Sequence, residues 1–296
     1  MLPDYSIVIA TRSRHLDLMR TLESLKAQTL QPERVVVVDA SPSNETRDLL
    51  EKNSFDRVVY LRADASSSAL QRNQGAREVR TPLISFLDDD VWLPPDLYEK
   101  LLSVLATDAE GRIGGVAGRI RGLEHSKPGR LLRWYYQIQA GYRHPHYGGR
   151  LFGPAINCLP CYAEEKGPLI EAEWLNSTCV LYRRELFEKQ QFPQFEGYSF
   201  MEDAHLSARI AKTHRLYFHA DAFYEHFSPE SSAKSDKRAL ARMRLHNQKI
   251  IAREVMGLGR VETQAKLLLH RLFTSFVIIR ERNPGWAREL EGTWSC

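Results

Sequence analysis

Three carboxylates end the apolar run Leu83-Ile84-Ser85-Phe86-Leu87-Asp88-Asp89-Asp90. A run of this length, rich in Ile and Phe, is typical of a buried β-strand. Open α/β sheets bind ligands in the crevice beyond the carboxyl ends of their strands, where these acids would lie. Three acids so close repel one another, so we expect a cation among them, and oxygen ligands favour Mg²⁺ or Mn²⁺. The alternatives are an ordinary acidic loop, or an Asp that caps the helix beginning near Pro95.

The residues before this stretch alternate between apolar runs and amphipathic segments. Strands are expected at Tyr5 to Ala10, Arg34 to Val38 and Arg57 to Leu61. Helices are expected from about Leu16 to Gln28, after Pro42 to about Lys52, and from Ser66 to Val79. With the acid-tipped strand, this β-α-β-α-β-α-β order over about ninety residues predicts an α/β fold with a doubly wound, mostly parallel sheet.

Polar residues follow several of these strands directly. Right-handed crossovers place the carboxyl ends of parallel strands at one edge of the sheet, so Thr11, Asp39 and the acid triplet should gather there. No Gly-x-Gly-x-x-Gly follows the first strand, which argues against a dinucleotide-binding Rossmann fold, and no Walker A loop is present either. A phosphate at this edge would therefore depend on a metal and on basic side chains.

Composition narrows the class of protein. The chain has 296 residues, enough for one large domain or two small ones, and its net charge of +4 is too weak to indicate nucleic acid as a partner. Cys158 and Cys161 have the spacing of half a zinc site, but no second pair follows. Because Asp4 and Arg12 interrupt any signal peptide and the run Leu272 to Ile279 is short for a bilayer span, we expect a cytoplasmic protein.

The middle of the chain is harder to interpret. A helix from Pro95 to Ala106 and a Gly-rich strand from Ile113 to Ile120 are expected, and a later strand from Trp174 to Tyr182. Between them, residues 122–170 have weak periodicity and many aromatic and basic side chains. This segment could be an acceptor-binding loop or lid, or it could pack irregularly against the sheet; both interpretations stay open.

Two later positions could carry chemistry. Ser199 and Glu202 match a capping box, which would give Glu202 a structural role at a helix start. Asp203 could favour the helix dipole, or it could act on a substrate. After a strand from Arg215 to His219 and a turn, His226 becomes a functional candidate only if it returns to the edge that holds the acid triplet.

The segment from Ala233 to about Glu281 is basic and helical, with Gly257 and Gly259 expected to separate two amphipathic helices. These helices could lie on an anionic bilayer, which would make the protein peripheral to a membrane. They could equally pack on the core through their apolar sides.

Several short motifs occur in an order that resembles family 2 glycosyltransferases of the GT-A fold, over about residues 5–230. The motifs are Ile7-Val8-Ile9-Ala10-Thr11, Val37-Val38-Asp39-Ala40-Ser41, Arg72-Asn73-Gln74-Gly75, Phe86-Leu87-Asp88-Asp89-Asp90, Glu202-Asp203 and His226. The resemblance implies a catalytic domain over residues 1–230, with a nucleotide-sugar half to about residue 120 and an acceptor and base half after it. Residues 231–296 would then form a basic helical C-terminal extension.

The resemblance also implies roles at the donor end of the site. Thr11, with Arg12 beside it, would lie near the nucleotide. Asp39 would bind the nucleobase, usually uracil, and the pair Arg72 and Asn73 would help to hold the nucleotide-sugar.

The Asp-x-Asp motif of the family corresponds to Asp88 and Asp90, with Asp89 facing the nucleotide-sugar. The last Asp of that motif usually touches the divalent metal, Mg²⁺ or Mn²⁺, so Asp90 is the first candidate ligand and Asp88 the second. Many members carry a late His on the metal or diphosphate, and His226 matches that place.

The Glu-Asp pair of the family corresponds to Glu202 and Asp203, with Asp203 as the catalytic base and Glu202 supporting it. Two departures concern the donor: Ala40 stands where many members have a second acid, and Asn176 where they often have Gly. The implied function is inverting transfer from a UDP- or dTDP-linked sugar to a glycan or lipid-linked hydroxyl. Alternatives are a non-catalytic nucleotide-sugar-binding scaffold and a metal-dependent nucleotidyltransferase, which would want a Gly-rich loop after the first strand.

Overall fold

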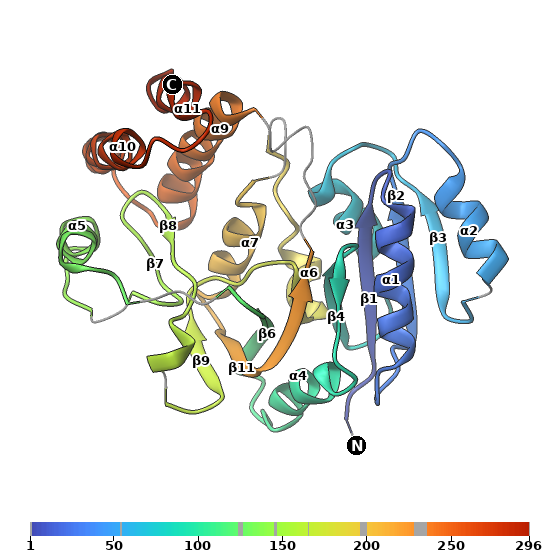
Figure 1. Cartoon of the computed structure of the whole chain (residues 1–296). Helices are drawn as coiled ribbons and strands as arrows, with labels where there is room; N and C mark the ends of the chain where they lie inside the picture. Colours follow the sequence, from blue (N-terminus) through green and yellow to red (C-terminus); the bar gives the residue numbers. More distant parts are fainter. Residues whose placement is uncertain are drawn as a thin grey trace.

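The computed structural model describes residues 2–53, 55–123, 127–144, 147–164, 166–195, 200–227 and 236–295. Four parallel strands form one side of its main sheet, in the spatial order β3-β2-β1-β4 (Figure 1). They are β1 (Tyr5–Thr11), β2 (Arg34–Asp39), β3 (Val58–Arg62) and β4 (Leu83–Asp88). The α/β class, the largely parallel sheet and the expected strands of the first ninety residues are thereby confirmed.

The sheet continues beyond β4 with strands of mixed direction, in the order β10-β6-β11-β5. They are β5 (Val91–Trp92), β6 (Ile113–Ile120), β10 (Cys179–Arg183) and β11 (Arg215–His226), and β9 (Leu169–Ala172) pairs with β11. β10 runs antiparallel to both β4 and β6, whereas β6 and β11 are parallel. Because the sheet is continuous, residues on both sides of position 120 reach the same edge.

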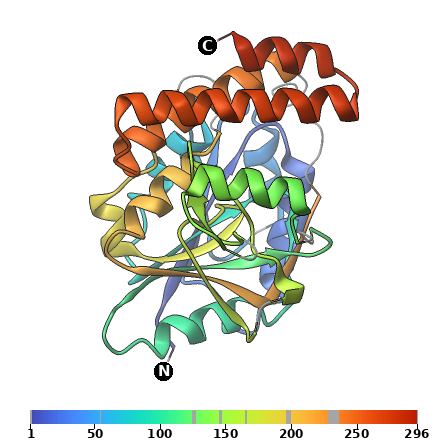
Figure 2. The ribbon, with the colours of Figure 1, turned by 90° about the vertical axis from the view of Figure 1, so that its left-hand side faces the viewer.

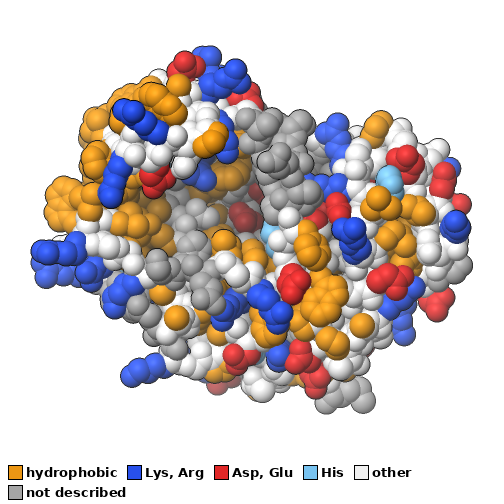
Figure 3. Space-filling view, viewed as in Figure 1, with side chains coloured by type: hydrophobic (Ala, Val, Ile, Leu, Met, Phe, Trp, Pro, Cys, Tyr) orange, Lys and Arg blue, Asp and Glu red, His pale blue; other side chains and the backbone are white. Residues whose placement is uncertain are grey.

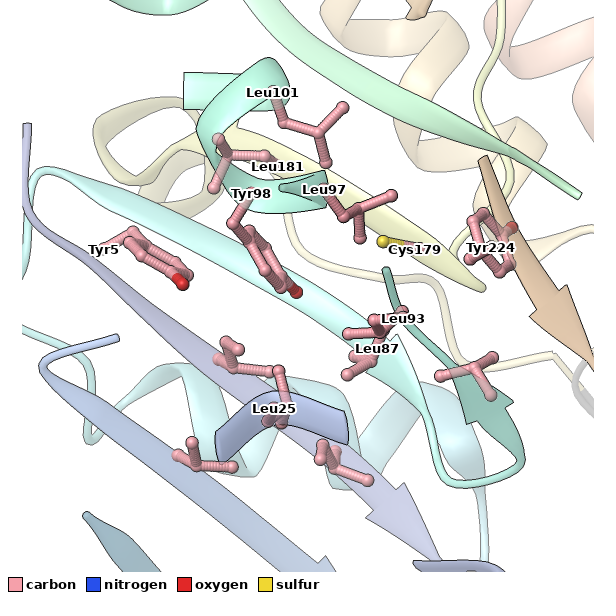
Figure 4. Close-up of a cluster of buried hydrophobic side chains, with 14 of the residues drawn as sticks. Tyr5, Leu25, Leu87, Leu93, Leu97, Tyr98, Leu101, Cys179, Leu181 and Tyr224 are labelled. Carbon is pink, nitrogen blue, oxygen red and sulfur yellow. The ribbon is translucent and has the colours of Figure 1, made fainter. Parts of the chain in front are cut away.

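Helices cover both faces of the sheet, and each face has its own apolar core. Tyr5, Tyr98 and Leu181 belong to the first core, shown in Figure 4, where the rings of Tyr5 and Tyr98 stack with their centroids 4.7 Å apart. This core lies under α1 (His15–Lys26), α2 (Glu45–Asn53) and α4 (Leu97–Ala106). The second core lies under α3 (Ser68–Ala76), α6 (Arg184–Lys189) and α7 (Glu202–Ile210). Burial on both faces explains why β2 reads as a continuous run of Val.

The close approach of α3 to β1 depends on Gly75. A Cβ atom at this position would lie 2.5 Å from Cγ1 of Val8 and 3.0 Å from Cγ2 of Val38. The missing side chain therefore lets α3 press against the sheet and fixes the height of Arg72 one turn earlier in the helix.

The structure corrects three expectations for the middle of the chain. Residues 122–170 are not simply irregular: they contain α5 (Arg130–Ala140), the hairpin of β7 (Leu151–Phe152) and β8 (Ile156–Asn157), and the short helix η1 (Tyr162–Glu164). The strand expected from Trp174 begins only at Cys179, because the N–H of Leu175 donates to Ser207 Oγ of α7, 2.9 Å away, instead of joining a ladder. β11 does not stop at His219 but runs on to His226, because a register shift against β6 absorbs the expected turn.

The C-terminal segment is helical, as expected. α9 (Lys237–Ile250) leads into η2 (Ile251–Val255), a turn of π-helix, and α10 (Arg260–Glu281) follows after Gly257, which adopts a left-handed φ of 73°. A further helix, α11 (Trp286–Trp294), was not expected; it packs beside α9 and α10 (Figure 1). Among the described residues, no helix combines the length and the apolar character that a membrane crossing requires.

Candidate active site

The acid triplet lies where β4 turns into β5, at the carboxyl edge of the parallel strands. β5 pairs with the end of β11, opposing Val91 to His226, and the N–H of Phe227 donates to the carbonyl oxygen of Asp90 at 2.9 Å. This backbone pairing returns the end of β11 to the triplet, more than 130 residues away in sequence. The condition that made His226 a functional candidate is met.

Asp88, Asp90 and His226 each offer one ligand atom, and these atoms lie within 4.8 Å of one another. His226 Nε2 is 3.0 Å from Asp90 Oδ1, a separation that two neighbouring ligands of an octahedral ion with bonds of about 2.1 Å adopt. The Asp90 side chain is 3% exposed and that of His226 is 19% exposed. Two carboxylates and an imidazole at this spacing therefore fit a divalent cation such as Mn²⁺ or Mg²⁺.

An arginine that the sequence motifs did not single out stabilises the triplet. Arg14, just before α1, lies 3.2 Å from Asp89 Oδ1 and 3.0 Å from Asp90 Oδ2. Burial alone would lower the pKa of Arg14, but Asp89 and Asp90 outweigh it and raise the pKa above its usual value. The only sequence signal was the basic character of residues 11–14, because the contact spans more than seventy positions.

The Asp89 carboxylate is buried and contacts the end of β1. Thr11 donates from Oγ1 to Asp89 Oδ2 at 2.6 Å, and both side chains are nearly buried. Burial raises the pKa of Asp89 to about 7, although Thr11 and Arg14 lower it, and its acidic neighbours add to the rise. Thr11 and Asp89, expected to face the nucleotide-sugar, therefore contact each other.

Arg72 connects the triplet to the Glu-Asp pair of α7. Its guanidinium lies 2.8 Å from Asp88 Oδ1 and 2.9 Å from Glu202 Oε1, and its side chain is 8% exposed. Burial acts to lower the pKa of Arg72, but Asp88 and Glu202 outweigh this effect and raise it. A single buried cation thus holds carboxylates from β4 and α7 together, although they are 114 residues apart.

α7 begins at Glu202, after Met201 in a left-handed conformation with φ 67°. Ser199, the expected partner in a capping box, lies outside the described residues. The Glu202 carboxylate contacts Arg72 and the Ser68 hydroxyl. Burial, with Asp203 adding to it, raises the pKa of Glu202 to about 7. Burial also raises the pKa of Asp203 to about 6, although the N–H of Ala204 donates to its carboxylate at 2.7 Å.

Asp39 lies at the end of β2 and is completely buried. Its Oδ1 accepts the N–H of Ser41 at 2.8 Å, and its Oδ2 accepts the Tyr60 hydroxyl at 3.1 Å, with Arg62 Nη1 3.6 Å away. Burial and the nearby Asp39 raise the pKa of Tyr60. Tyr60 and Arg62 of β3 were not among the expected site residues, because strand pairing alone brings them to Asp39.

Arg12 and Asn73, the two remaining expected residues, have different surroundings. Arg12 donates from Nη1 to Ser66 Oγ at 2.7 Å in an exposed position at the same edge. Asn73 uses its amide group on the backbone of Phe192, with Nδ2 donating to the carbonyl at 2.9 Å and Oδ1 accepting the N–H at 3.0 Å. Asn73 therefore joins α3 to the loop before α7.

Acidic side chains and a histidine show in the hollow below the C-terminal helices, near the centre of Figure 3. The contacts link this edge into one network, from Thr11 and Arg14 through the triplet to Arg72 and α7. Such an edge can hold a cation, and it presents carboxylates with raised pKa values that can exchange protons near neutral pH.

Comparisons with known proteins agree with this geometry. The family model described as glycosyl transferase family 2 matches residues 6–163. The validoxylamine A glucosyltransferase of Streptomyces hygroscopicus subsp. limoneus is 35% identical over 117 residues, a match that covers 38% of this chain and only 26% of that relative.

Solved structures resemble the chain over most of its length. GalNAc-T7 with UDP, GalNAc and Mn²⁺ is 16% identical with a TM-score of 0.57, and the likeness covers 87% of this chain and 52% of that one. Residues 1–349 of S. aureus TarS in complex with UDP-GlcNAc are 15% identical with a TM-score of 0.55, covering 96% of this chain and 75% of that one. At such low identity, these likenesses show the shared GT-A fold.

Proposed function

Because the chain belongs to glycosyl transferase family 2, we propose that it transfers a sugar from a nucleoside diphosphate sugar to a hydroxyl group of a glycan or lipid-linked acceptor. The observation that carries the proposal is the convergence of Asp88, Asp90 and His226 next to the Glu-Asp pair of α7. UDP and UDP-GlcNAc in the two structural neighbours favour a uridine or thymidine diphosphate donor.

The donor end of the proposed site lies between the ends of β1 and β2. In our proposal the nucleobase meets Asp39, while Thr11 and Arg12 flank the nucleotide. Since the hydroxyl groups of Ser41 and Tyr60 both donate to the completely buried Asp39 carboxylate, one of them must give way to the base. Asn73 then acts indirectly. It holds the backbone of Phe192, and the ring of Phe192 lies 5.4 Å from the guanidinium of Arg72.

Asp88, Asp90 and His226 are the proposed ligands of a divalent cation. When bound, the cation would offset the negative charge that builds on the diphosphate leaving group. Arg14 orients Asp89 and Asp90 through its two ion pairs, and Arg72 orients Asp88 in the same way. Both arginines therefore preorganise the carboxylates before the donor arrives.

Asp203 is the proposed general base. Burial brings its pKa to about 6, so at pH 7 it is mostly ionised and still basic enough to accept a proton from the acceptor hydroxyl. That hydroxyl attacks the face of the sugar opposite to the diphosphate, so the displacement inverts the anomeric configuration. Glu202 supports the base by fixing Arg72 at the start of α7.

Release of free nucleoside diphosphate from a panel of nucleotide sugars, with Mn²⁺ and a mixture of glycan acceptors, tests the proposal. Asp203→Asn should lose about 10²- to 10⁴-fold in turnover, the usual contribution of a general base, while donor binding followed by thermal shift survives. Asp48→Asn, in an exposed helical position, is the matched control and should keep wild-type turnover.

Three outcomes would contradict this assignment. Near wild-type turnover of Asp203→Asn would remove Asp203 as the base. Full activity of the wild type in EDTA would count against the cation at Asp88 and Asp90. Donor binding without release of the diphosphate, with every acceptor tried, would favour the non-catalytic scaffold.

A further inference from the structure

α5 and α10 lie side by side on one flank of the molecule, as Figure 2 shows. Gln139 Nε2 donates to the carbonyl oxygen of Lys266 at 3.0 Å, and the rings of Tyr135 and Phe273 stack 3.8 Å apart. The Tyr135 hydroxyl also lies 2.6 Å from His270 Nδ1. Gln139, the later residue of α5, contacts the earlier part of α10, and Tyr135 contacts its later part, so the two helices run antiparallel.

Each helix turns an apolar stripe outward, away from these contacts. On α5, Leu131, Trp134 and Ile138 are 49%, 59% and 44% exposed, at the spacing of one helix face. On α10 the same is true of Leu268, Leu272 and Phe276, at 51%, 53% and 49%. Continuing the antiparallel register brings Trp134 level with Leu272. We call this surface the α5–α10 face, and it consists of Leu131, Trp134, Ile138, Leu268, Leu272 and Phe276.

The segments that carry the α5–α10 face are strongly basic. Residues 127–143 and 260–282 hold nine Lys and Arg but only two Asp and Glu, a surplus of seven positive charges, whereas the whole chain has a surplus of four. Arg130 and Arg133 are exposed on α5 beside Leu131 and Trp134. In Figure 3, hydrophobic and basic side chains gather together along the edge occupied by α5 and α10.

We propose that the α5–α10 face docks on the surface of an anionic lipid bilayer, with both helices lying parallel to it. Apolar stripes with a large Trp, flanked by cations, are the pattern of helices that enter the boundary between headgroups and acyl chains. The apolar residues alone would also suit a second protein. We assign the face to anionic lipid because the segments that carry it have a surplus of positive charge. The inference is independent of the sugar transfer proposed above, although it would bring a lipid-linked acceptor to the same surface.

Flotation with vesicles tests the proposal. Wild-type protein should bind vesicles of phosphatidylcholine mixed with phosphatidylglycerol at about 0.1 M salt. The bound fraction should be much smaller at about 1 M salt, where screening shortens the reach of charges to about 3 Å. The double variant Leu272→Glu with Phe276→Glu should lose at least about ten-fold in binding. Both side chains are half exposed, so the variant should fold, which circular dichroism checks.

Two further variants separate the apolar and the charged contributions. Arg133→Gln should weaken binding to phosphatidylglycerol vesicles about five-fold, the effect of one basic residue near such a surface, with no change for phosphatidylcholine alone. Leu16→Glu is the matched control: this Leu is 63% exposed on α1, a helix that lies far from α5 in Figure 1, and its replacement should leave vesicle binding unchanged.

Two results would overturn the proposal. One is that the wild-type protein does not bind anionic vesicles, or that the double variant Leu272→Glu with Phe276→Glu binds them as strongly as the wild type. The other is a concentration-dependent dimer in light scattering that this double variant abolishes while vesicle binding is unaffected, which would make a second copy of the chain the occupant of the face.

Discussion

Replacing Arg72 by Met should destabilise the protein strongly, and more at high pH than at low pH. The guanidinium is the buried cation between Asp88 and Glu202, at 2.8 and 2.9 Å. Removing one partner of a buried ion pair costs about 3–5 kcal/mol, because the other charge is left without compensation. At roughly 2 °C per kcal/mol for a chain of this size, the melting temperature should fall by about 6–10 °C.

The pH dependence follows from the carboxylates that remain. Burial already raises the pKa of Glu202 to about 7, well above its usual value of 4.5, so the folded protein binds a proton more tightly than the unfolded chain. Stability from this group therefore increases as the pH falls from about 7 towards 4.5. Without Arg72 the pKa of Glu202 should rise further, so the loss of stability should be larger at pH 8 than at pH 5.5.

Urea unfolding at the two pH values measures this effect. Arg121→Met is the control, because Arg121 forms an exposed ion pair with Glu225 at 3.2 Å, worth less than about 1 kcal/mol. A loss below about 1 kcal/mol for Arg72→Met at both pH values, equal to that of the control, would refute the buried network as the element that joins β4 to α7.

Three other predictions address the chemistry and the packing. Turnover by the wild type should fall as the pH drops through about 6, because Asp203 then holds a proton and cannot accept another, and a flat profile from pH 5 to 8 would exclude it as the base. His226→Ala should raise the Mn²⁺ concentration needed for half-maximal activity at least about ten-fold without changing the melting temperature; an unchanged metal requirement would exclude this ligand. Gly75→Val should cost at least about 2 kcal/mol in urea unfolding, because even its Cβ would lie 2.5 Å from Val8, and a stable variant would show that α3 can move.

The sequence predicted the parallel half of the sheet because both of its faces are buried. Such strands appear as unbroken apolar runs, as in Val35 to Val38, and a carboxylate after a run marks its carboxyl end without further information. Thr11, Asp39 and Asp88 could therefore be assigned to one edge before any contact was known. α5 was missed although it is amphipathic: Tyr135 is buried and Trp134 is exposed, so apolar residues extend beyond the buried side of the helix and blur the pattern.

The parts of the site that sequence reasoning missed depend on long-range contacts. Arg14 reaches Asp89 and Asp90 only because β1 and β4 are neighbours in the sheet. Arg62 and Tyr60 reach Asp39 through the pairing of β2 with β3. Apart from the basic character of residues 11–14, nothing local distinguishes these residues. The pairing register of the strands selects them, and no short motif encodes that register.

The charge balance of the edge gives a physical reason why it should take up a cation. Five carboxylates converge there: Asp88, Asp89, Asp90, Glu202 and Asp203. Among the described residues, two arginines, Arg14 and Arg72, form ion pairs with them, so full ionisation of these groups would leave a surplus of three negative charges in a largely buried space. Burial, with the neighbouring carboxylates adding to it, raises the pKa values of Asp89, Glu202 and Asp203. If these residues served only to join the end of β4 to the start of α7, fewer carboxylates would give a more stable fold. A site that binds a divalent cation, in contrast, needs a surplus of negative charge.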